Sequence, residues 1–463
     1  MTRTLVWFRD DLRTADHPAL YAACRYAEGD GTGDVVAVYV LDEVSDGVRP
    51  LGGAAKWWLH GALGSLRARL DELGVPLLLR TGDPARLIPH LAEQLGADRV
   101  QWTRRYGGPE RRLDAHLKEQ LRQHGVEVES FPGSLLHEPW TVETQTGGPY
   151  QVFTPFWRAV SARPQQDPLP VPTPCWEAKS TAASLAAAGV PRGELRDLDL
   201  RPTAPDWAGG LRRRWEPSEM AGQRQLEEFL RQKVTDYDDA RDRPELDGTS
   251  GLSPYLRFGQ LSPRQVWAAA CEEAPEQADG FLSELGWREF CWHLLFHFPQ
   301  MPQQNLKAQF DAYPWQSRAQ QPEAFRAWAR GETGFAWVDA GQRELWETGH
   351  MHNRVRMASA SLLVKNLGID WREGEAWFWD TLVDADAASN PANWQWVAGC
   401  GADAAPYFRI FNPERQLERF DPQRRYVRRW IPELDTADYP QPVVDLGVSR
   451  REALAHYESI KKR

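Results

Sequence analysis

The chain has 463 residues, of which 42% are hydrophobic, and a formal net charge of −10. This length suits two or three domains with sizeable cores, and no apolar run approaches the roughly 20 residues that cross a bilayer. The acidic total argues against indiscriminate binding to nucleic acids, although a total hides local basic patches.

The first residues carry charges after only a few apolar ones and form no signal-peptide core. The five cysteines are scattered and include no CxxC pair, so the sequence indicates neither a disulfide framework nor a cysteine metal cluster. We therefore expect a cytoplasmic protein. The cysteines are Cys24, Cys175, Cys271, Cys291 and Cys400.

Residues 1–131 alternate short apolar runs with amphipathic segments. The runs predict strands at 5–8, 35–41, 77–80, 99–102 and 126–129, and the segments predict helices at 18–28, 54–73, 84–95 and 110–124. Such alternation favours an α/β domain with a doubly wound parallel five-stranded sheet, whose ligands bind at the carboxyl ends of the strands. Neither GxGxxG nor GxxxxGK[ST] occurs there, so a dinucleotide or P-loop site is not predicted.

Residues 132–216 are rich in proline and predict a long connector, with one ordered piece at 150–160. From 217 to 463 helical spacing dominates, and glycine or proline breaks divide the chain into many helices. We expect an all-α second domain. It carries most of the 22 tryptophans, more than core packing readily explains. It also carries an arginine-rich run at 409–429, either a solvated surface or a face for phosphates.

Two segments of the helical domain carry chemically useful side chains. Residues 247–254, DGTSGLSP, combine flexible glycines, hydroxyls and a helix start, which suits either a phosphate seat or an ordinary capped turn. In 281–290, FLSELGWREF, the side chains of Glu284, Trp287 and Arg288 share one helix face. These side chains could hydrogen-bond a base edge, stack on its ring and pair with a phosphate. They could equally belong to an amphipathic helix with an exposed ion pair.

Two further segments hold the densest groups of charged, amide and indole side chains. In 350–357 a helix would bring Asn353, Arg356 and Met357 to one face. The HxH pair of this segment, His350 and His352, lacks the other ligands that a metal needs. In 382–396, LVDADAASNPANWQW, the two carboxylates Asp384 and Asp386 suit a divalent cation or a partner arginine and a ring N–H. The neighbouring indoles and amide favour a large, flat, partly charged organic ligand.

At these residues the chain resembles the DNA photolyase/cryptochrome family. The shared motifs are LVWFRDDLR, VFTPFW, TSGLSPYLRFG, ELGWREF, MHNRVRM, D-x-D-x-x-x-N, WQW and DAAPYFRIFNP, and they span nearly the whole chain. Within the family the pattern is most similar to bacterial class I cyclobutane pyrimidine dimer (CPD) photolyases. Asn353 stands where (6-4) photolyases and animal cryptochromes have histidine, and Asn390 stands where plant cryptochromes have aspartate.

The resemblance implies a folded FAD, active when reduced and anionic. Its cofactor-binding residues would be Tyr237, Thr249, Ser250, Gly251, Leu252, Ser253, Trp287, Asn353, Arg356, Asp384, Ala385, Asp386 and Asn390. Asn390 would face flavin N5, and an electron would reach the flavin through Trp315, Trp371 and Trp394.

The implied activity is light-driven repair, in which a pyrimidine dimer is flipped out of DNA and split by an electron from excited FAD. Glu284 would hydrogen-bond the pyrimidines, and DNA would be contacted by Arg241, Glu284, Trp287, Arg288, Asn353, Arg354, Met357, Trp396 and Arg415. Extruding a dimer is least costly at an already distorted step. We expect a monomer without obligate protein partner or metal.

Several positions depart from the family pattern. His350 and Phe281 replace residues that are commonly tryptophan, and His350 adds a titratable group near the flavin. Glu110 matches an acid of folate-binding members, but Pro109 replaces their asparagine. The resemblance therefore leaves open whether an antenna chromophore binds, and whether it is a folate, a deazaflavin or FMN.

Two other functions compete with the repair lyase. A cryptochrome-like photoreceptor would bind FAD without repairing DNA, and it predicts loss of the chemistry of Glu284, Trp287 or Asn353. A metal-dependent enzyme using Asp384 and Asp386 predicts metal-dependent activity and a colourless protein.

Overall fold

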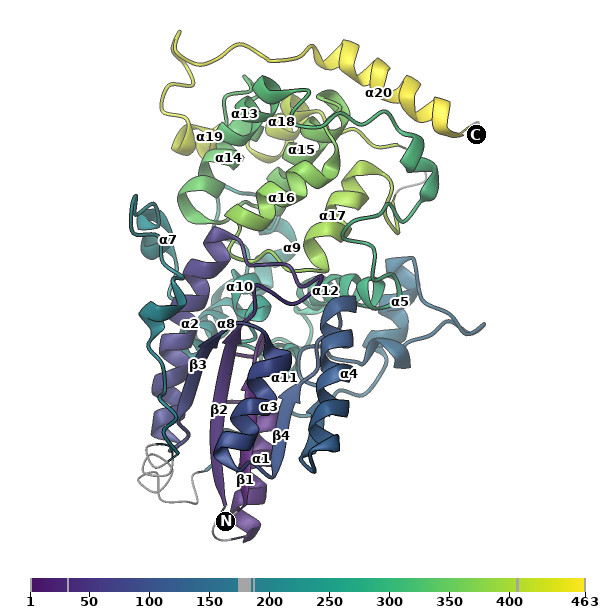
Figure 1. The fold of residues 1–463 in the computed structure, drawn as a ribbon. Helices are drawn as coiled ribbons and strands as arrows, with labels where there is room; N and C mark the ends of the chain where they lie inside the picture. Colours follow the sequence, from purple (N-terminus) through teal and green to yellow (C-terminus); the bar gives the residue numbers. More distant parts are fainter. Residues whose placement is uncertain (1, 31–32, 174–184, 186–187, 405–407, 462–463) are drawn as a thin grey trace.

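The computed structural model describes residues 2–30, 33–173, 185, 188–404 and 408–461 (Figure 1). Cys175 and residues 405–407 of the motif at 403–413 lie outside this part of the chain. Within the described part, no helix is both long enough and apolar enough to span a membrane.

The N-terminal part holds one parallel five-stranded sheet, as the sequence predicts. The strands are β1 (Arg3–Phe8), β2 (Asp34–Leu41), β3 (Leu77–Thr81), β4 (Arg99–Thr103) and β5 (Glu127–Phe131), in the order β3-β2-β1-β4-β5. Every strand pair is parallel. β1 is the central strand. The chain continues from it through β2 to β3 on one side and then through β4 to β5 on the other, which gives the doubly wound topology.

Four helices cover the two faces of this sheet: α1 (Pro18–Asp30), α2 (Gly53–Glu72), α3 (Pro84–Leu95) and α4 (Gly108–Gln123). Successive side chains of a strand point to opposite faces. Val6 and Phe8 therefore pack with α1 and α2, whereas Leu5 and Trp7 pack with α3 and α4. Burial on both faces explains why the strands are continuously apolar rather than alternating.

The predicted connector contains more regular structure than its proline content indicates. It includes η1 (Pro139–Thr141), α5 (Phe153–Ser161), η2 (Leu195–Leu198) and α7 (Gly209–Arg214). α5 corresponds to the ordered piece expected at 150–160. Its Phe153 ring stacks on Trp287 with 3.8 Å between ring centroids and 11° between planes. The connector thus supports the helix that carries Glu284.

The rest of the described chain is helical, and none of it forms a strand beyond the isolated bridge between Gln316 and Ile369. Its helices are α8 (Glu219–Gln232), α9 (Tyr237–Ala240), α10 (Ser253–Arg257), α11 (Pro263–Glu273), α12 (Asp279–His297), α13 (Pro322–Arg330), α14 (Ala336–Thr348), α15 (Asn353–Ser361), α16 (Trp371–Thr381), α17 (Ser389–Ala398), α18 (Pro413–Phe420), α19 (Arg425–Trp430) and α20 (Leu446–Lys461). Short 3-10 turns η3 (Val234–Asp236) and η4 (Ala308–Ala312) and a π-helical turn η5 (Leu362–Asn366) connect them.

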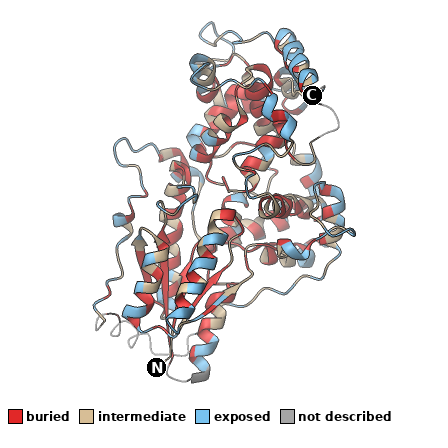
Figure 2. Cartoon of the chain, turned by 45° about the vertical axis from the view of Figure 1, so that its right-hand side comes forward, coloured by how far each residue is buried: buried red, intermediate tan, exposed pale blue. Residues whose placement is uncertain are grey.

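Two larger hydrophobic cores organise most of these helices, beside a smaller cluster that joins α5 to α12. The first, which we call the sheet-side core, joins the α1/α2 face of the sheet to α8, α10, α11 and α12 through Phe8, Leu63, Phe229, Phe258 and Leu285. The second, the distal core, lies among the helices from α13 onward and contains Trp328, Trp337, Val364, Trp371 and Tyr426. Figure 2 shows the buried residues as red faces within both halves of the molecule.

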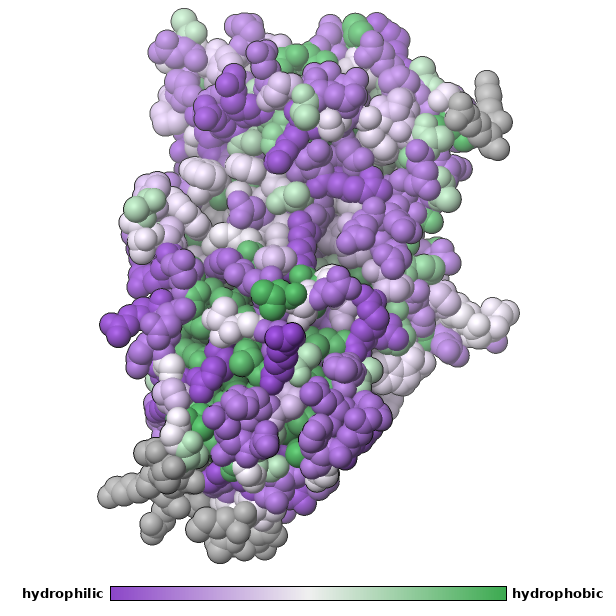
Figure 3. Space-filling model, viewed as in Figure 1, coloured by the Kyte–Doolittle hydropathy of each residue, from purple (hydrophilic) through white to green (hydrophobic). Residues whose placement is uncertain are grey.

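The two halves also differ at the surface. On the face shown in Figure 3, hydrophilic side chains predominate over the helical half, while apolar side chains gather over the sheet half.

Candidate functional site

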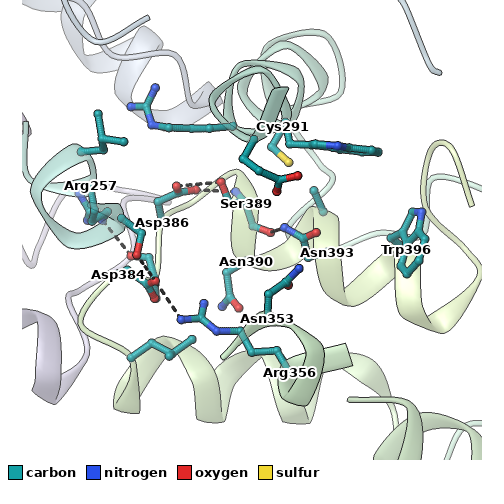
Figure 4. Close-up of a pocket in the computed structure, with 18 of the residues that line it drawn as sticks. Arg257, Cys291, Asn353, Arg356, Asp384, Asp386, Ser389, Asn390, Asn393 and Trp396 are labelled. Carbon is teal, nitrogen blue, oxygen red and sulfur yellow. Dashed lines mark hydrogen bonds and ion pairs between the residues drawn. The ribbon is translucent and has the colours of Figure 1, made fainter. Parts of the chain in front are cut away.

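A cavity of about 520 Å³ lies where the two cores meet. It is lined by α10 and α12 from the sheet-side core, by α15 and α17 from the distal side, and by the segment 382–386. Its size falls within the roughly 300–1,000 Å³ of small-molecule and cofactor sites. Asp384 and Asp386 lie at one end and Trp396 at the other, with Asn353 and Asn390 between them (Figure 4).

Local sequence explains why these elements begin where they do. Pro254 occupies the first turn of α10, as the sequence predicts, and Gly259 with φ +62 follows the helix. The His352 Nδ1 atom accepts from the backbone N–H of Arg354 and caps α15. This start brings Asn353, Arg356 and Met357 to the cavity, as expected from their spacing.

Asp384 is a buried carboxylate that faces the cavity. Its Oδ2 accepts from Arg356 Nη2 at 2.9 Å and from the Ser253 hydroxyl at 2.7 Å. Burial alone would raise the pKa of Asp384, but Arg356 and Ser253 outweigh it and hold that pKa below its usual value. Its Oδ1 is buried without a hydrogen-bond partner among the described residues. One acceptor thus remains for a ligand.

Asp386 has a different task from Asp384. It accepts from the backbone N–H groups of Ala388 and Ser389 and from the Ser389 hydroxyl, so it fixes the turn that leads into α17. The two carboxylates are therefore committed to separate partners, and Arg356 places a positive charge beside Asp384. In the described part of the chain, no group of three or more His, Cys, Asp or Glu residues is arranged to hold a metal ion. This geometry disfavours the metal-dependent enzyme.

Asn390 lies in the middle of the cavity and is fixed from behind by α16. Its Nδ2 donates to the backbone carbonyl of Glu375 at 3.0 Å and to Glu375 Oε1 at 2.7 Å. The amide oxygen is left for a ligand. Burial raises the pKa of Glu375, against the opposing effects of Arg49 and Asn390.

Charged and aromatic side chains form the wall on the α12 side. Glu284 Oε1 accepts from Arg241 Nη2 at 2.5 Å. Arg354 pairs with both carboxylate oxygens of Asp242 at 2.7 and 2.6 Å. Two of the arginines expected to bind DNA are therefore already engaged in ion pairs. A third, Arg288, donates to the carbonyl of Ser134 and to the buried Glu289.

The three tryptophans expected to carry an electron differ in how deeply they are buried. Trp394 lines the cavity and packs edge-on against Phe378 at 5.0 Å. A Cβ on Gly374 would lie 2.2 Å from Trp394 Cη2, so α16 approaches this ring closely only because residue 374 is glycine. Trp371, at the start of α16, is fully buried, and Trp315 is half-buried. The backbone bonds of the Gln316–Ile369 bridge keep the last two segments together.

The structure brings most of the expected site residues to one cavity. Those that line it are Tyr237, Arg241, Ser250, Leu252, Ser253, Glu284, Trp287, Arg288, Asn353, Arg354, Arg356, Met357, Asp384, Ala385, Asp386, Asn390, Trp394 and Trp396. Those that do not line it are Thr249, Gly251, Trp315, Trp371 and Arg415. Arg415 is exposed on α18.

The two residues that depart from the family pattern take different places in the structure. Phe281 lines the cavity, whereas His350 does not. The His350 Nδ1 atom lies 3.3 Å from Glu344 Oε1, and the Tyr426 hydroxyl donates to Glu344 Oε2 at 2.6 Å. Burial alone would raise the pKa of Glu344, but His350 and Tyr426 hold it below its usual value.

Some lining residues escaped the sequence reasoning. Arg257 donates from Nε to the carbonyl of Ala385 at 2.8 Å and from Nη1 to Asp10 at 2.6 Å, and so joins the cavity wall to the loop after β1. It stands inside the TSGLSPYLRFG motif, which was the available signal. Cys291 and Ser389 also line the cavity. No sequence signal marked Arg49 or Glu375, which are 326 positions apart.

A second, smaller cavity of about 120 Å³ lies at the carboxyl ends of the strands, where the doubly wound sheet predicts a ligand. Arg9, Asp10, Arg104, Arg105 and Glu110 are among its lining residues. Arg257 and Arg288 line both cavities.

The sequence and the fold match known proteins along the whole chain. The family model described as DNA photolyase matches residues 4–174, and the one described as the FAD binding domain of DNA photolyase matches residues 281–438. The chain is 44% identical to a deoxyribodipyrimidine photo-lyase of Agrobacterium fabrum, over 99% of this chain and 98% of the relative. It is 34% identical to cryptochrome-2 of Arabidopsis thaliana, over 93% of this chain and 71% of the relative.

A solved structure shares the fold as well. The crystal structure of a bacterial class III photolyase from Agrobacterium tumefaciens matches with a TM-score of 0.91 and 42% identity, over 100% of this chain and 98% of that chain.

Proposed function

The chain belongs to the DNA photolyase family, and on that premise we propose that it uses light to split cyclobutane pyrimidine dimers in DNA. FAD is its cofactor, since residues 281–438 match the FAD binding domain of DNA photolyase, a range that holds most of α12 and all of α15, α16 and α17. The class I likeness stays a prediction, because the similar solved structure is described as class III.

The main cavity fits a flavin nucleotide. It offers an unpaired carboxylate oxygen on Asp384 and a buried indole N–H on Trp394 that has no partner among the described residues. Buried polar groups of this kind are rarely left unpaired unless a ligand completes them. Arg356, Ser253, Ser250 and Asn390 add charged and polar contacts around an otherwise apolar lining. Light-excited reduced FAD, when bound, supplies the electron that splits the dimer.

The protein's own residues bind and orient the dimer. A dimer inside the duplex cannot reach a cavity walled by α12 and α15, so it has to be extruded. Trp287 and Trp396 would replace its lost stacking, each worth about 1–3 kcal/mol. Glu284 would hydrogen-bond the pyrimidine edges, and Met357 and Asn353 would form the floor.

Arginines would hold the DNA backbone. Arg241, Arg288 and Arg354 lie at the cavity, and their phosphate contacts would give sequence-neutral, salt-dependent affinity. Arg415 is exposed on α18 and does not line the cavity, so its contact would be with DNA beyond the lesion. Trp394, Trp371 and Trp315 would carry an electron between the surface and the flavin.

The observation that carries this proposal is the convergence of Glu284, Trp287, Asn353, Met357 and Asn390 on one cavity. The runner-up, a cryptochrome-like photoreceptor, is favoured by the similarity to cryptochrome-2. It would not need this set of lesion-facing side chains.

The deciding experiment is repair of a thymine-dimer oligonucleotide by pre-reduced protein, under blue light and in darkness. Light-dependent recovery of intact thymines, lost in Glu284→Ala, supports the lyase. A yellow protein that binds the lesion without repairing it supports the photoreceptor, and a colourless protein contradicts both.

A further inference from the structure

We propose that Arg49 is a positioning residue: it holds Glu375 so that the amide oxygen of Asn390 faces the flavin. Arg49 belongs to the loop between β2 and α2, whereas Glu375 lies on α16 and Asn390 on α17. The inference rests on the proposed function and on the family resemblance, which implies that Asn390 faces flavin N5.

The loop that carries Arg49 is fastened to α16. The Arg49 Nη1 atom lies 2.7 Å from Glu375 Oε1 and 2.9 Å from Oε2, and its guanidinium stacks at 4.2 Å over the ring of Trp379. Trp379 Nε1 donates to the carbonyl of Pro50 at 2.9 Å, and the backbone N–H of Gly53 donates to Asp380 at 2.8 Å. The position of Arg49 is therefore set by several contacts.

The orientation of the Asn390 amide follows from its two partners. Glu375 offers Asn390 a backbone carbonyl and a carboxylate oxygen, and both are acceptors. Only Nδ2 can occupy that position, because the amide oxygen would face two other oxygens without a hydrogen. The oxygen of the amide must then point to the other side, toward the cavity.

This orientation depends on the charge of Glu375. A protonated carboxyl would carry an O–H group that donates to the amide oxygen and favours the reversed amide. Glu375 is buried, with a side chain only 5% exposed, and burial favours the protonated form. Arg49 opposes this by favouring the carboxylate, so removing its charge weakens the support for the observed orientation.

The amide orientation in turn selects a flavin oxidation state. An amide oxygen accepts from the N5–H of reduced FAD, whereas a reversed amide donates to the bare N5 of oxidised FAD. Loss of the Arg49 charge should therefore make the midpoint potential of the bound FAD more negative.

The test compares FAD-loaded full-length protein with Arg49→Met and Arg49→Lys. We expect the equilibrium constant for reduction to fall about tenfold in Arg49→Met, which is about 30 mV for a two-electron couple. An infrared band of a protonated carboxyl should appear and vanish again in Arg49→Met/Glu375→Gln. Arg49→Lys should restore both values, because it returns the charge.

Arg111→Met is the matched control. Arg111 is also an exposed arginine of the sheet domain that stacks on an aromatic ring of the helical domain, Phe296, at 3.9 Å, but it contacts neither Glu375 nor the cavities. An unchanged potential in Arg49→Met, without the carboxyl band, would overturn the inference. If Arg49→Met does not fold, Arg49→Gln keeps a donor without the charge and is judged by the same two readouts. A wild-type protein that binds FAD but repairs nothing contradicts the proposed function instead.

Discussion

Arg241 donates a 2.5 Å hydrogen bond to the carboxylate of Glu284 on the wall of the main cavity. The two residues have different proposed roles, since Glu284 would bind the pyrimidines and Arg241 a phosphate. Each charge neutralises the other. If these residues bind DNA as proposed, the DNA would have to replace or share this ion pair.

Replacing Glu284 with Gln tests the proposed contact to the lesion. The variant keeps the shape of the side chain and loses its charge, so we expect repair per absorbed photon to fall roughly 10–100-fold, as for one charge-assisted hydrogen bond. The absorption spectrum of the bound FAD should not change. Glu273→Gln, at the exposed end of α11, is the control. Equal repair by Glu284→Gln and wild type would remove Glu284 from the mechanism.

Salt dependence tests the proposed phosphate contacts. Each contact to duplex DNA contributes about 0.9 to the slope of log K against log salt concentration. We expect Arg354→Met to lower that slope by about one and to weaken binding to damaged and undamaged DNA alike. Arg192→Met provides the comparison, because Arg192 also pairs with an aspartate, Asp71, but neither lines the cavity nor belongs to the arginine-rich run at 409–429. A slope that stays at the wild-type value would contradict a phosphate contact by Arg354.

Acid stability tests the ion pair of Asp384 with Arg356. The folded-state pKa of Asp384 is lowered, so its stabilisation is present above the ordinary pKa of about 3.9 and is lost as pH falls through the lower folded value. We expect Asp384→Asn to lower the free energy of unfolding at pH 7 by about 2 kcal/mol. That difference should shrink below about pH 4.

The measurement is urea unfolding of the FAD-free protein across pH 2–7. Asp435→Asn serves as its control, since the exposed Arg428–Asp435 pair should contribute under about 1 kcal/mol. A pH-independent difference between wild type and Asp384→Asn would show that burial, and not charge, causes it.

Electron transfer through the tryptophans can be tested separately from repair itself. We expect Trp371→Phe to abolish light-driven reduction of oxidised FAD by an external reductant, while protein reduced beforehand still repairs DNA. Trp328→Phe should change neither, although the Trp328 ring also lies 6.1 Å from Trp394. Transient absorption of the flavin after a laser pulse makes the comparison. Normal photoreduction in Trp371→Phe would mean that electrons take another route.

Periodicity predicted the elements of this fold well. The five strands lie within two residues of the expected ranges, and α1 to α4 follow the expected order. The local motifs also predicted their own geometry: Glu284, Trp287 and Arg288 share a wall because their spacing matches one helix face. Such features depend on residues close together in the chain.

The parts that sequence reasoning missed depend on distant residues. Nothing near Arg49 indicates that it pairs with Glu375, and nothing near Ser253 indicates that its hydroxyl donates to Asp384. Thr249 and Gly251 belong to the right motif, but their neighbours Ser250 and Leu252 take the places on the cavity wall. Tertiary packing decides such alternatives among adjacent residues.

The sheet-side core has a practical consequence for anyone who wants to study the halves of this protein separately. Phe8 and Leu63 of the sheet domain and Phe229, Phe258 and Leu285 of the helical domain bury one another. Cutting the chain at residue 217 would expose this shared interior as one apolar face on each fragment. Each exposed apolar face would promote aggregation. We expect the fragment 217–463 to be recovered mainly in inclusion bodies, and to become soluble when it is co-expressed with 1–216.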